Sequence, residues 1–279
     1  MQLLNLPEEL LLSILEHAIV PADPRVSLPD STPLLACRAL HRIGLPVLYR
    51  TLLLISSSNA ELVCHTLLER PSLVRHVCHL YSRVSTLGLL LVLRAIGHAK
   101  GSLQTLDFHL NIPWMSGRLD GSEEEEPLAA VHVRQLTVRQ GTVMFPRHYV
   151  SRIATVLAEA IERWPNLEVV EIEPRILLLT SVPREDPSPL ALALSRSPSL
   201  RFLRTALPPA WDPSLLAVSE NPSLKRIVLT TPRLSSVSDR ISSTEVDVPA
   251  ASLIAKKDDH PWLVEAQKYH RLMRLLVAP

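Results

Sequence analysis

The most constraining feature of the sequence is a short hydrophobic pattern, apolar-x-x-apolar-x-apolar, that recurs along the middle of the chain. The four complete copies are Leu103, Leu106, Phe108; Val133, Leu136, Val138; Leu167, Val170, Ile172; and Leu224, Ile227, Leu229. Two weaker copies end in a polar residue, and they are Val77, Leu80, Ser82 and Leu200, Leu203, Thr205. A loose repeat of this kind predicts small units that cannot bury their apolar faces alone and therefore stack on their neighbours.

The segments between these copies have helical features. Apolar residues recur at helical spacing at Ile153, Val156, Leu157, Ala160, Ile161 and Trp164. Ser188-Pro189 and Asp212-Pro213 predict the starts of shorter helices, because a capping side chain precedes a proline whose missing N–H is not needed there. Strands alternating with helices predict an α/β fold over residues 53–232, an irregular helix-strand solenoid with a parallel sheet.

The two ends of the chain differ from this repeat. Residues 233–259 are rich in Ser, Asp and Lys and predict a linker, and Trp262–Val277 predicts one amphipathic helix that caps the solenoid. Residues 1–52 predict a separate helical module. Its first helix has Pro7 at an early position and Glu8 and Glu9 in the first turn, where the helix dipole favours negative charge.

The first helix is unusually apolar. Leu10, Ile14 and Ala18 line one face, Leu11 and Leu15 widen this stripe, and Leu12 lies outside it, so the helix has more apolar surface than one core contact needs. We therefore expect a second apolar partner for this helix. After a proline-rich loop, a helix from Pro33 is expected to contain Leu34, Leu35, Cys37, Leu40 and Ile43 and to be interrupted by Pro46. A strand is expected at Thr51–Ile55.

The N-terminal residues resemble an F-box. The matching residues are Leu6-Pro7-Glu8-Glu9-Leu10-Leu11-Leu12, Ile14-Leu15, Leu35-Ala36-Cys37-Arg38-Ala39-Leu40-His41-Arg42-Ile43 and Pro46-x-Leu48-Tyr49-Arg50. In that family the leucine-proline pair, the first helix and the cysteine-containing helix face the Skp adaptor of a cullin-based ubiquitin ligase. The resemblance implies that the adaptor-binding residues are Leu6, Pro7, Leu10, Leu11, Ile14, Leu15, Leu35, Cys37 and Leu40.

The repeated pattern is similar to leucine-rich repeats. Leu103-x-x-Leu106-x-Phe108-x-x-Asn111 includes the asparagine found in regular members. An F-box followed by such repeats resembles fungal substrate receptors, in which the repeats hold a protein substrate and the F-box holds the ligase. Such a protein has no active site of its own and needs no cofactor.

Composition excludes several other classes. A net charge of +1 gives no overall attraction to nucleic acid or to an anionic membrane, and no apolar run reaches the length of a membrane span. The first residues lack the basic segment of a signal peptide, and three cysteines cannot all pair. We expect a chain located in the cytoplasm, the nucleus or both.

Several residue clusters of the chain have a simple structural interpretation. Cys64, His76, Cys78 and His79 lack the close ligand pairs of zinc modules, so core cysteines and ordinary histidines are the expectation. The acidic run at residues 123–126 is expected to be a solvated loop. A basic patch of Arg134, Arg139, Arg147, His148 and Arg152 is not expected, because alternate residues on a strand point to opposite faces. Two alternatives stay open: a repeat scaffold capped by its N-terminal helices, and an enzyme whose histidines come from distant positions.

Overall fold

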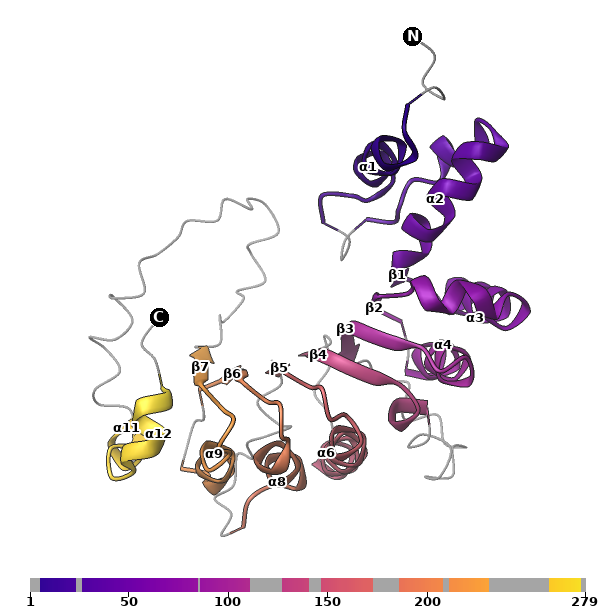
Figure 1. The fold of residues 1–279 in the computed structure, drawn as a ribbon. Helices are drawn as coiled ribbons and strands as arrows, with labels where there is room; N and C mark the ends of the chain where they lie inside the picture. The colour runs from indigo at the N-terminus through magenta and orange to yellow at the C-terminus, as the bar shows by residue number, and fades with distance from the viewer. Residues whose placement is uncertain are drawn as a thin grey trace, which may run out of the picture. The chain divides into compact units, whose positions relative to one another are not determined.

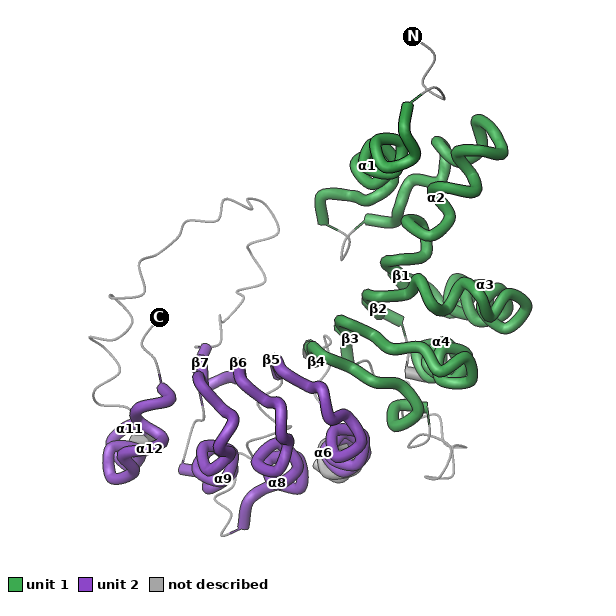
Figure 2. Tube along the Cα trace, viewed as in Figure 1, with its two compact units in different colours: residues 1–144 green, residues 145–279 purple. Residues whose placement is uncertain are grey.

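The computed structural model of the chain describes residues 6–23, 27–84, 86–110, 127–140, 147–172, 186–207, 211–230 and 261–276. Contacts divide the chain into two compact units, which are unit 1 (residues 1–144) and unit 2 (residues 145–279) (Figure 2). The boundary between them falls inside the predicted repeat region, and the predicted divisions at residues 52 and 232 stay predictions. The predicted linker at 233–259, the acidic run at 123–126 and Asn111 lie outside the described residues.

Unit 1 begins with two α-helices and a short 3-10 helix, which we call the N-terminal module (residues 6–50). Its elements are α1 (Glu8–Ile19), η2 (Thr32–Leu35) and α2 (Arg38–Arg50) (Figure 1). Pro7 is the residue before α1, and two glutamates occupy the first turn as expected. Helices therefore form in this part of the chain, and a separate F-box-like module at residues 1–52 stays a prediction.

The prediction of one helix from Pro33 that stops at Pro46 is wrong in two respects. The chain forms η2 and then a separate helix α2, and Cys37, in an extended conformation, lies between them as the residue before α2. Helix α2 also continues through Pro46 to Arg50. Proline removes one backbone hydrogen bond inside a helix. Burial of Val47, one residue later, in the module's core helps to offset that loss.

The rest of unit 1 alternates strands with helices. The elements in chain order are β1 (Thr51–Leu54), α3 (Ser57–Glu69), η3 (Pro71–His76), β2 (His79–Ser82), α4 (Thr86–His98), β3 (Ser102–Leu110) and β4 (His132–Gln140). The strands pair in parallel in the order β1-β2-β3-β4, and α3 and α4 lie along one side of them (Figure 1). The expectation of an α/β architecture with parallel strands is confirmed for this unit.

Unit 2 continues the alternation. Its elements are α6 (Arg147–Glu162), β5 (Val169–Ile172), α8 (Pro189–Arg196), β6 (Phe202–Ala206), α9 (Pro213–Ser219), β7 (Arg226–Thr230), α11 (Pro261–Ala266) and α12 (His270–Leu275). Strands β5, β6 and β7 pair in parallel in that order, with α6, α8 and α9 on one side (Figure 1). The two predicted caps are confirmed, because Ser188 Oγ accepts from the Ala191 N–H and Asp212 Oδ1 accepts from the Ser214 N–H.

Strand register shows that the repeated pattern is structural. Equivalent pattern positions of consecutive copies lie directly opposite each other within each unit: Leu80 with Leu106, Leu106 with Leu136, Phe108 with Val138, Val170 with Leu203, and Leu203 with Ile227. The polar ends of the weak copies, Ser82 and Thr205, are buried at the same position as the apolar ends of their neighbours. The pattern therefore marks a buried row in each strand from β2 to β7, whereas β1 has no copy of it.

The prediction of a single C-terminal helix over Trp262–Val277 is wrong. The chain forms α11 and α12, and Tyr269 between them is extended. Its ring stacks on Trp211 with centroids 5.3 Å apart, which holds this residue out of a helix. Helix α12 packs against α9, and Arg271 donates to the carbonyl oxygens of Ser219 and Asn221. These two short helices thus cover the last helix-strand unit of unit 2.

Candidate docking surface and adjoining sites

The N-terminal module has a hydrophobic core of its own. The buried residues are Leu11, Leu15, Ile19, Leu34, Leu40, Ile43 and Val47, and Leu6 and Cys37 pack partly buried against them. Gly44 lies at the closest approach of the three helices. A Cβ atom there would overlap Leu34 Cδ2 and would lie 3.2 Å from both Ile19 Cδ1 and Leu15 Cδ1. The helices therefore pack closely only because position 44 has no side chain.

Two ion pairs join α1 to α2 outside this core. Arg42 Nη2 lies 3.0 Å from Glu8 Oε2, and Arg50 Nη1 lies 3.1 Å from Glu16 Oε1. Both pairs are largely solvent-exposed, so each contributes little to stability. The partners are eight residues apart on each helix, so the pairs indicate that α1 and α2 run in the same direction.

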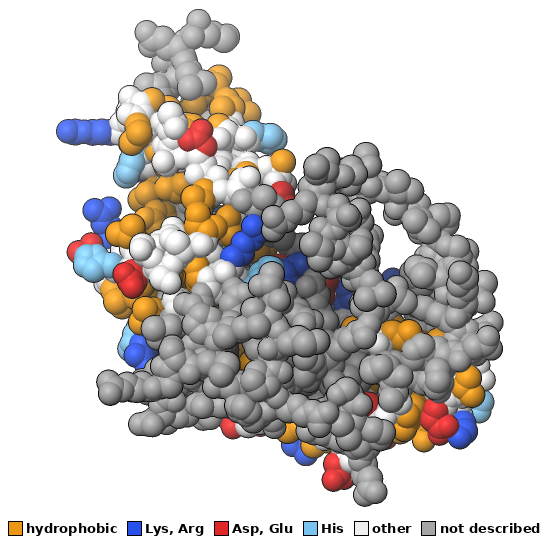
Figure 3. Space-filling model, turned by 180° about the vertical axis from the view of Figure 1, so that it is seen from behind, with side chains coloured by type: hydrophobic (Ala, Val, Ile, Leu, Met, Phe, Trp, Pro, Cys, Tyr) orange, Lys and Arg blue, Asp and Glu red, His pale blue; other side chains and the backbone are white. Residues whose placement is uncertain are grey.

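Other apolar side chains of the module lie on its surface. Leu10 is 52% exposed and Ile14 is 44% exposed, one turn apart on α1, while Leu35 at the end of η2 is 81% exposed. Leu12 and Leu28 are also exposed. Figure 3 shows hydrophobic side chains on the part of the surface that contains the N-terminal helices. Large apolar side chains at the surface of one small module are typical of a protein-protein contact.

The predicted adaptor-binding residues divide between this surface and the core. Pro7, Leu10, Ile14 and Leu35 are exposed, and Leu6 and Cys37 are half-buried. Leu11, Leu15 and Leu40 are 4%, 3% and 8% exposed, so they have almost no area left for a partner to cover. These three residues hold the module together, and a docking role stays a prediction for the other six.

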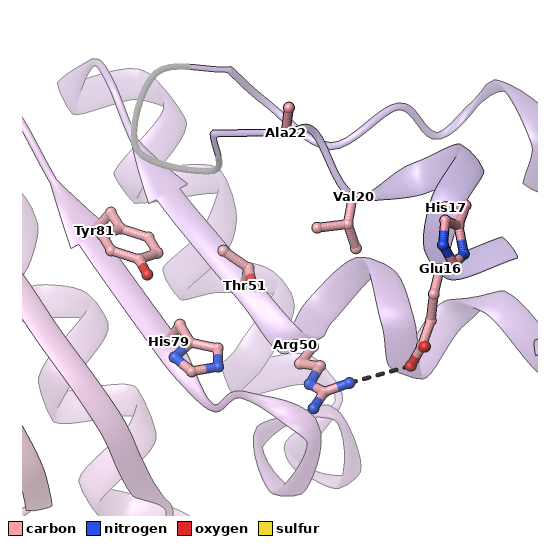
Figure 4. Close-up of a pocket in the computed structure, with 8 residues that line it drawn as sticks. All are labelled: Glu16, His17, Val20, Ala22, Arg50, Thr51, His79 and Tyr81. Atoms are coloured by element: carbon pink, nitrogen blue, oxygen red, sulfur yellow. Dashed lines mark hydrogen bonds and ion pairs between the residues drawn. The ribbon is translucent and has the colours of Figure 1, made fainter. Parts of the chain in front are cut away.

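An open pocket of about 620 Å³ adjoins the module where α1 ends and β1 and β2 begin (Figure 4). Its lining residues are Glu16, His17, Val20, Ala22, Arg50, Thr51, His79 and Tyr81. The Glu16–Arg50 ion pair forms one wall, and His79 and Tyr81 project from β2 on the other side (Figure 4). The pocket volume lies in the range usual for small-ligand sites, and a peptide side chain would also fit.

A second polar site extends from this pocket across β2, β3 and β4, on the strand face opposite the buried pattern residues. We call it the polar face, and its rows follow the strand register. His79, Thr105 and Gln135 form the first row; Tyr81, Asp107 and Thr137 form the second. Arg83 follows β2, and His109 pairs with Arg139 in the third row. Sequence reasoning missed this face, although polar residues at alternate positions of β2 were a usable signal.

The ionisable groups of the polar face interact closely. Arg139 Nε donates to both carboxylate oxygens of Asp107, at 2.9 Å and 3.2 Å, and His79 Nδ1 lies 3.2 Å from Thr105 Oγ1. Burial lowers the pKa of His79, and the charge of Arg50 lowers it further. Burial also lowers the pKa of His109, with Asp107 opposing the shift and Arg139 and Arg83 adding to it.

The side chains considered as metal ligands are not brought together. Among the described residues, no three His, Cys, Asp or Glu side chains lie where they could hold a metal ion. The Cys64 thiol donates to the Leu91 carbonyl at 3.5 Å, and burial raises its pKa. The three cysteines are free thiols.

Within the described ranges no helix has the length and apolar character to cross a membrane.

A search with models of known protein families and a search of curated proteins both find no match to this chain.

The basic patch considered from the sequence lies partly outside the described residues. The structure does not describe the side chains of Arg147, His148 and Arg152.

Proposed function

We propose that this chain is a substrate-recognition subunit of a Skp-cullin-F-box type ubiquitin ligase. The N-terminal module binds a Skp-type adaptor, and the helix-strand repeats bind a protein substrate. The chain supplies recognition only, and ubiquitin transfer belongs to the other subunits of the ligase. The observation that carries the proposal is the division of the module into a closed core and an outer surface with Leu10, Ile14 and Leu35 exposed.

The exposed side chains are suited to a protein partner for an energetic reason. Complete burial of a leucine or isoleucine side chain contributes about 1.5–3 kcal/mol, and these three residues begin roughly half exposed or more. Covering all three would contribute about 3 kcal/mol, which corresponds to about a hundredfold in affinity. None of the three belongs to the module's core cluster, so they can be changed without opening it.

A binding experiment tests the adaptor proposal. The variant combines Leu10→Asp, Ile14→Asp and Leu35→Asp, and binding to a purified Skp-type adaptor is measured by calorimetry or by co-purification. We expect at least about a hundredfold weaker binding. The control is Leu62→Asp, which changes a leucine that is 69% exposed on α3, outside the module. Equal adaptor binding by the triple variant and the control would refute the assigned surface.

The alternative function is a repeat scaffold or protein-interaction module without a ligase. One observation favours it: α2 ends at Arg50, β1 begins at Thr51, and α2 packs against η3, as a terminal cap would. Deleting residues 1–52 separates the two functions. Loss of solubility together with no measurable adaptor binding by the full chain supports the scaffold, whereas a soluble remainder that only loses the adaptor supports the receptor.

A further inference from the structure

The polar face differs from the other strand surfaces of the chain. The strand positions that alternate with the buried rows of β2, β3 and β4 are all polar. The corresponding positions in unit 2 include Val169, Phe202 and Val228, all half-buried and apolar. In unit 1 the helices α3 and α4 lie along one side of the strands (Figure 1). The rows of pattern residues in β2, β3 and β4 are buried, as expected for the side that helices cover. A strand face with polar residues at successive positions is typical of a surface that contacts water or a polar partner.

The accessible side chains of this face are mainly hydrogen-bond donors. Three of its residues are buried, namely Thr105, Asp107 and Thr137. The six that remain accessible are His79, Tyr81, Arg83, His109, Gln135 and Arg139. Each of the six can donate a hydrogen bond, and none is a carboxylate. The single carboxylate of the polar face, Asp107, is 3% exposed and accepts from Arg139.

The charges have the same bias. The polar face and the adjoining pocket contain three guanidinium groups, those of Arg50, Arg83 and Arg139, against the carboxylates of Glu16 and Asp107. Burial is the main cause of the lowered pKa values of His79 and His109; arginine charges add to both shifts, while Asp107 opposes the shift at His109. A ligand with hydrogen-bond acceptors and negative charge would complement this surface.

We propose that the polar face binds an acidic, extended peptide segment of a partner protein, with Asp or Glu carboxylates against Arg83, His109 and Arg139. Tyr81, His79 and Gln135 donate to the peptide's carbonyl or side-chain oxygens. The peptide can continue into the pocket beside Val20 and Ala22, because His79 and Tyr81 belong to both sites. This proposal rests on the proposed function in one respect: the acidic peptide segment is then part of the protein substrate of the ligase.

The test uses the full chain without any adaptor. Fluorescence anisotropy measures binding of a fluorescein-labelled peptide of alternating Glu and Ser residues. The same peptide with Gln in place of Glu tests for charge, and one with Gln in place of Glu and phosphoserine in place of Ser distinguishes phosphate from carboxylate. We expect the Glu peptide to bind at least about tenfold more tightly than the Gln peptide, and binding to weaken as salt is added.

The variants test the residues. Arg83→Gln with His109→Gln leaves the Asp107–Arg139 pair in place, and we expect it to weaken binding of the Glu peptide about tenfold. Arg83→Lys, which retains the charge, should keep most of the affinity. The control is Arg94→Gln, an exposed arginine on α4 in the same unit, which should bind like the unchanged chain. Equal thermal unfolding midpoints establish that the variants are folded, and Arg83→Gln alone replaces the double variant if it is not.

Several results would overturn the proposal. These are equal binding of the Glu and Gln peptides, binding of the phosphoserine peptide alone, or equal losses for Arg83→Gln with His109→Gln and for Arg94→Gln. Tighter binding of single-stranded RNA than of the Glu peptide would also overturn it. The adaptor-surface variant with Leu10, Ile14 and Leu35 changed to Asp should bind the Glu peptide normally, so a failure of the adaptor proposal is seen separately.

Discussion

Replacing Asn221 with alanine tests how consecutive repeats are held together. Its side chain is buried in the turn after α9, where Nδ2 donates to the carbonyl oxygens of Leu194 at 2.7 Å and of Ser197 at 2.8 Å. Its Oδ1 accepts from the Ser223 N–H at 2.9 Å. One amide side chain therefore hydrogen-bonds to backbone groups at the end of α8 and in the turn after α9, so it links two consecutive helix-strand repeats of unit 2.

The expected loss follows from these three hydrogen bonds. A typical hydrogen bond contributes about 1 kcal/mol net, and a buried group left without a partner costs about 1–3 kcal/mol. The Leu194 carbonyl keeps a second donor, the Ser197 N–H at 3.3 Å, so its loss is the smallest. We expect Asn221→Ala to lower the free energy of unfolding by about 2–3 kcal/mol. Asn221→Asp should cost more, because a carboxylate would face two carbonyl oxygens.

The assay is thermal and urea unfolding followed by far-ultraviolet circular dichroism. At about 2–4 °C per kcal/mol, the Asn221→Ala midpoint should fall by roughly 5–10 °C. The control is Asn166→Ala, an exposed asparagine in an earlier turn of unit 2, which should stay within about 0.5 kcal/mol of the unchanged chain. If Asn221→Ala is no less stable than Asn166→Ala, the side chain does not link the repeats and the reasoning is refuted.

Three further predictions concern packing, pH and the C-terminal helices. Gly44→Val should destabilise the N-terminal module by about 1–3 kcal/mol, measured as a lower urea midpoint, because even a Cβ atom would overlap Leu34; an unchanged midpoint would show that the helices can separate at no cost. The folded-state pKa values of His79 and His109 lie below the ordinary 6.5, so the unfolded chain binds protons first as the pH falls. Stability should therefore be complete above about pH 6.5 and decrease as the pH falls below it, and changing both histidines to Gln should flatten this dependence in urea titrations. Arg271→Met should loosen α12 from α9 and speed hydrogen exchange in α12, because both backbone hydrogen bonds of the guanidinium are lost; exchange as slow as in the unchanged chain would contradict this role.

Much of the fold follows from local features of the sequence. The six copies of the hydrophobic pattern form the buried rows of β2 to β7, apart from the half-buried Leu229, and the polar ends at Ser82 and Thr205 follow the same register. The Ser188-Pro189 and Asp212-Pro213 pairs begin helices as predicted, because capping involves only neighbouring residues. Periodicity and capping act over a few residues, and a sequence displays them directly.

Other features depend on contacts between distant residues. The local sequence does not predict that Asn221 donates to the carbonyl oxygens of Leu194 and Ser197. Nor does it predict that Tyr269 is extended and stacks on Trp211. Helix α2 passes through Pro46 although the local preference is to stop there, since neighbouring residues pack into a core made with α1. Tertiary packing outweighs local propensity at these positions.

The sequence by itself determined the succession of small helix-strand units and an N-terminal helical module rich in apolar residues. Only the tertiary structure decided which of those apolar residues face outward: Leu11 and Leu15 are buried, and Leu10 and Ile14 are exposed, on the same helix. It also decided that polar residues of β2, β3 and β4 form one surface. The physical reason is that periodicity defines the faces of a helix or strand, whereas the partner packed against each face comes from elsewhere in the chain.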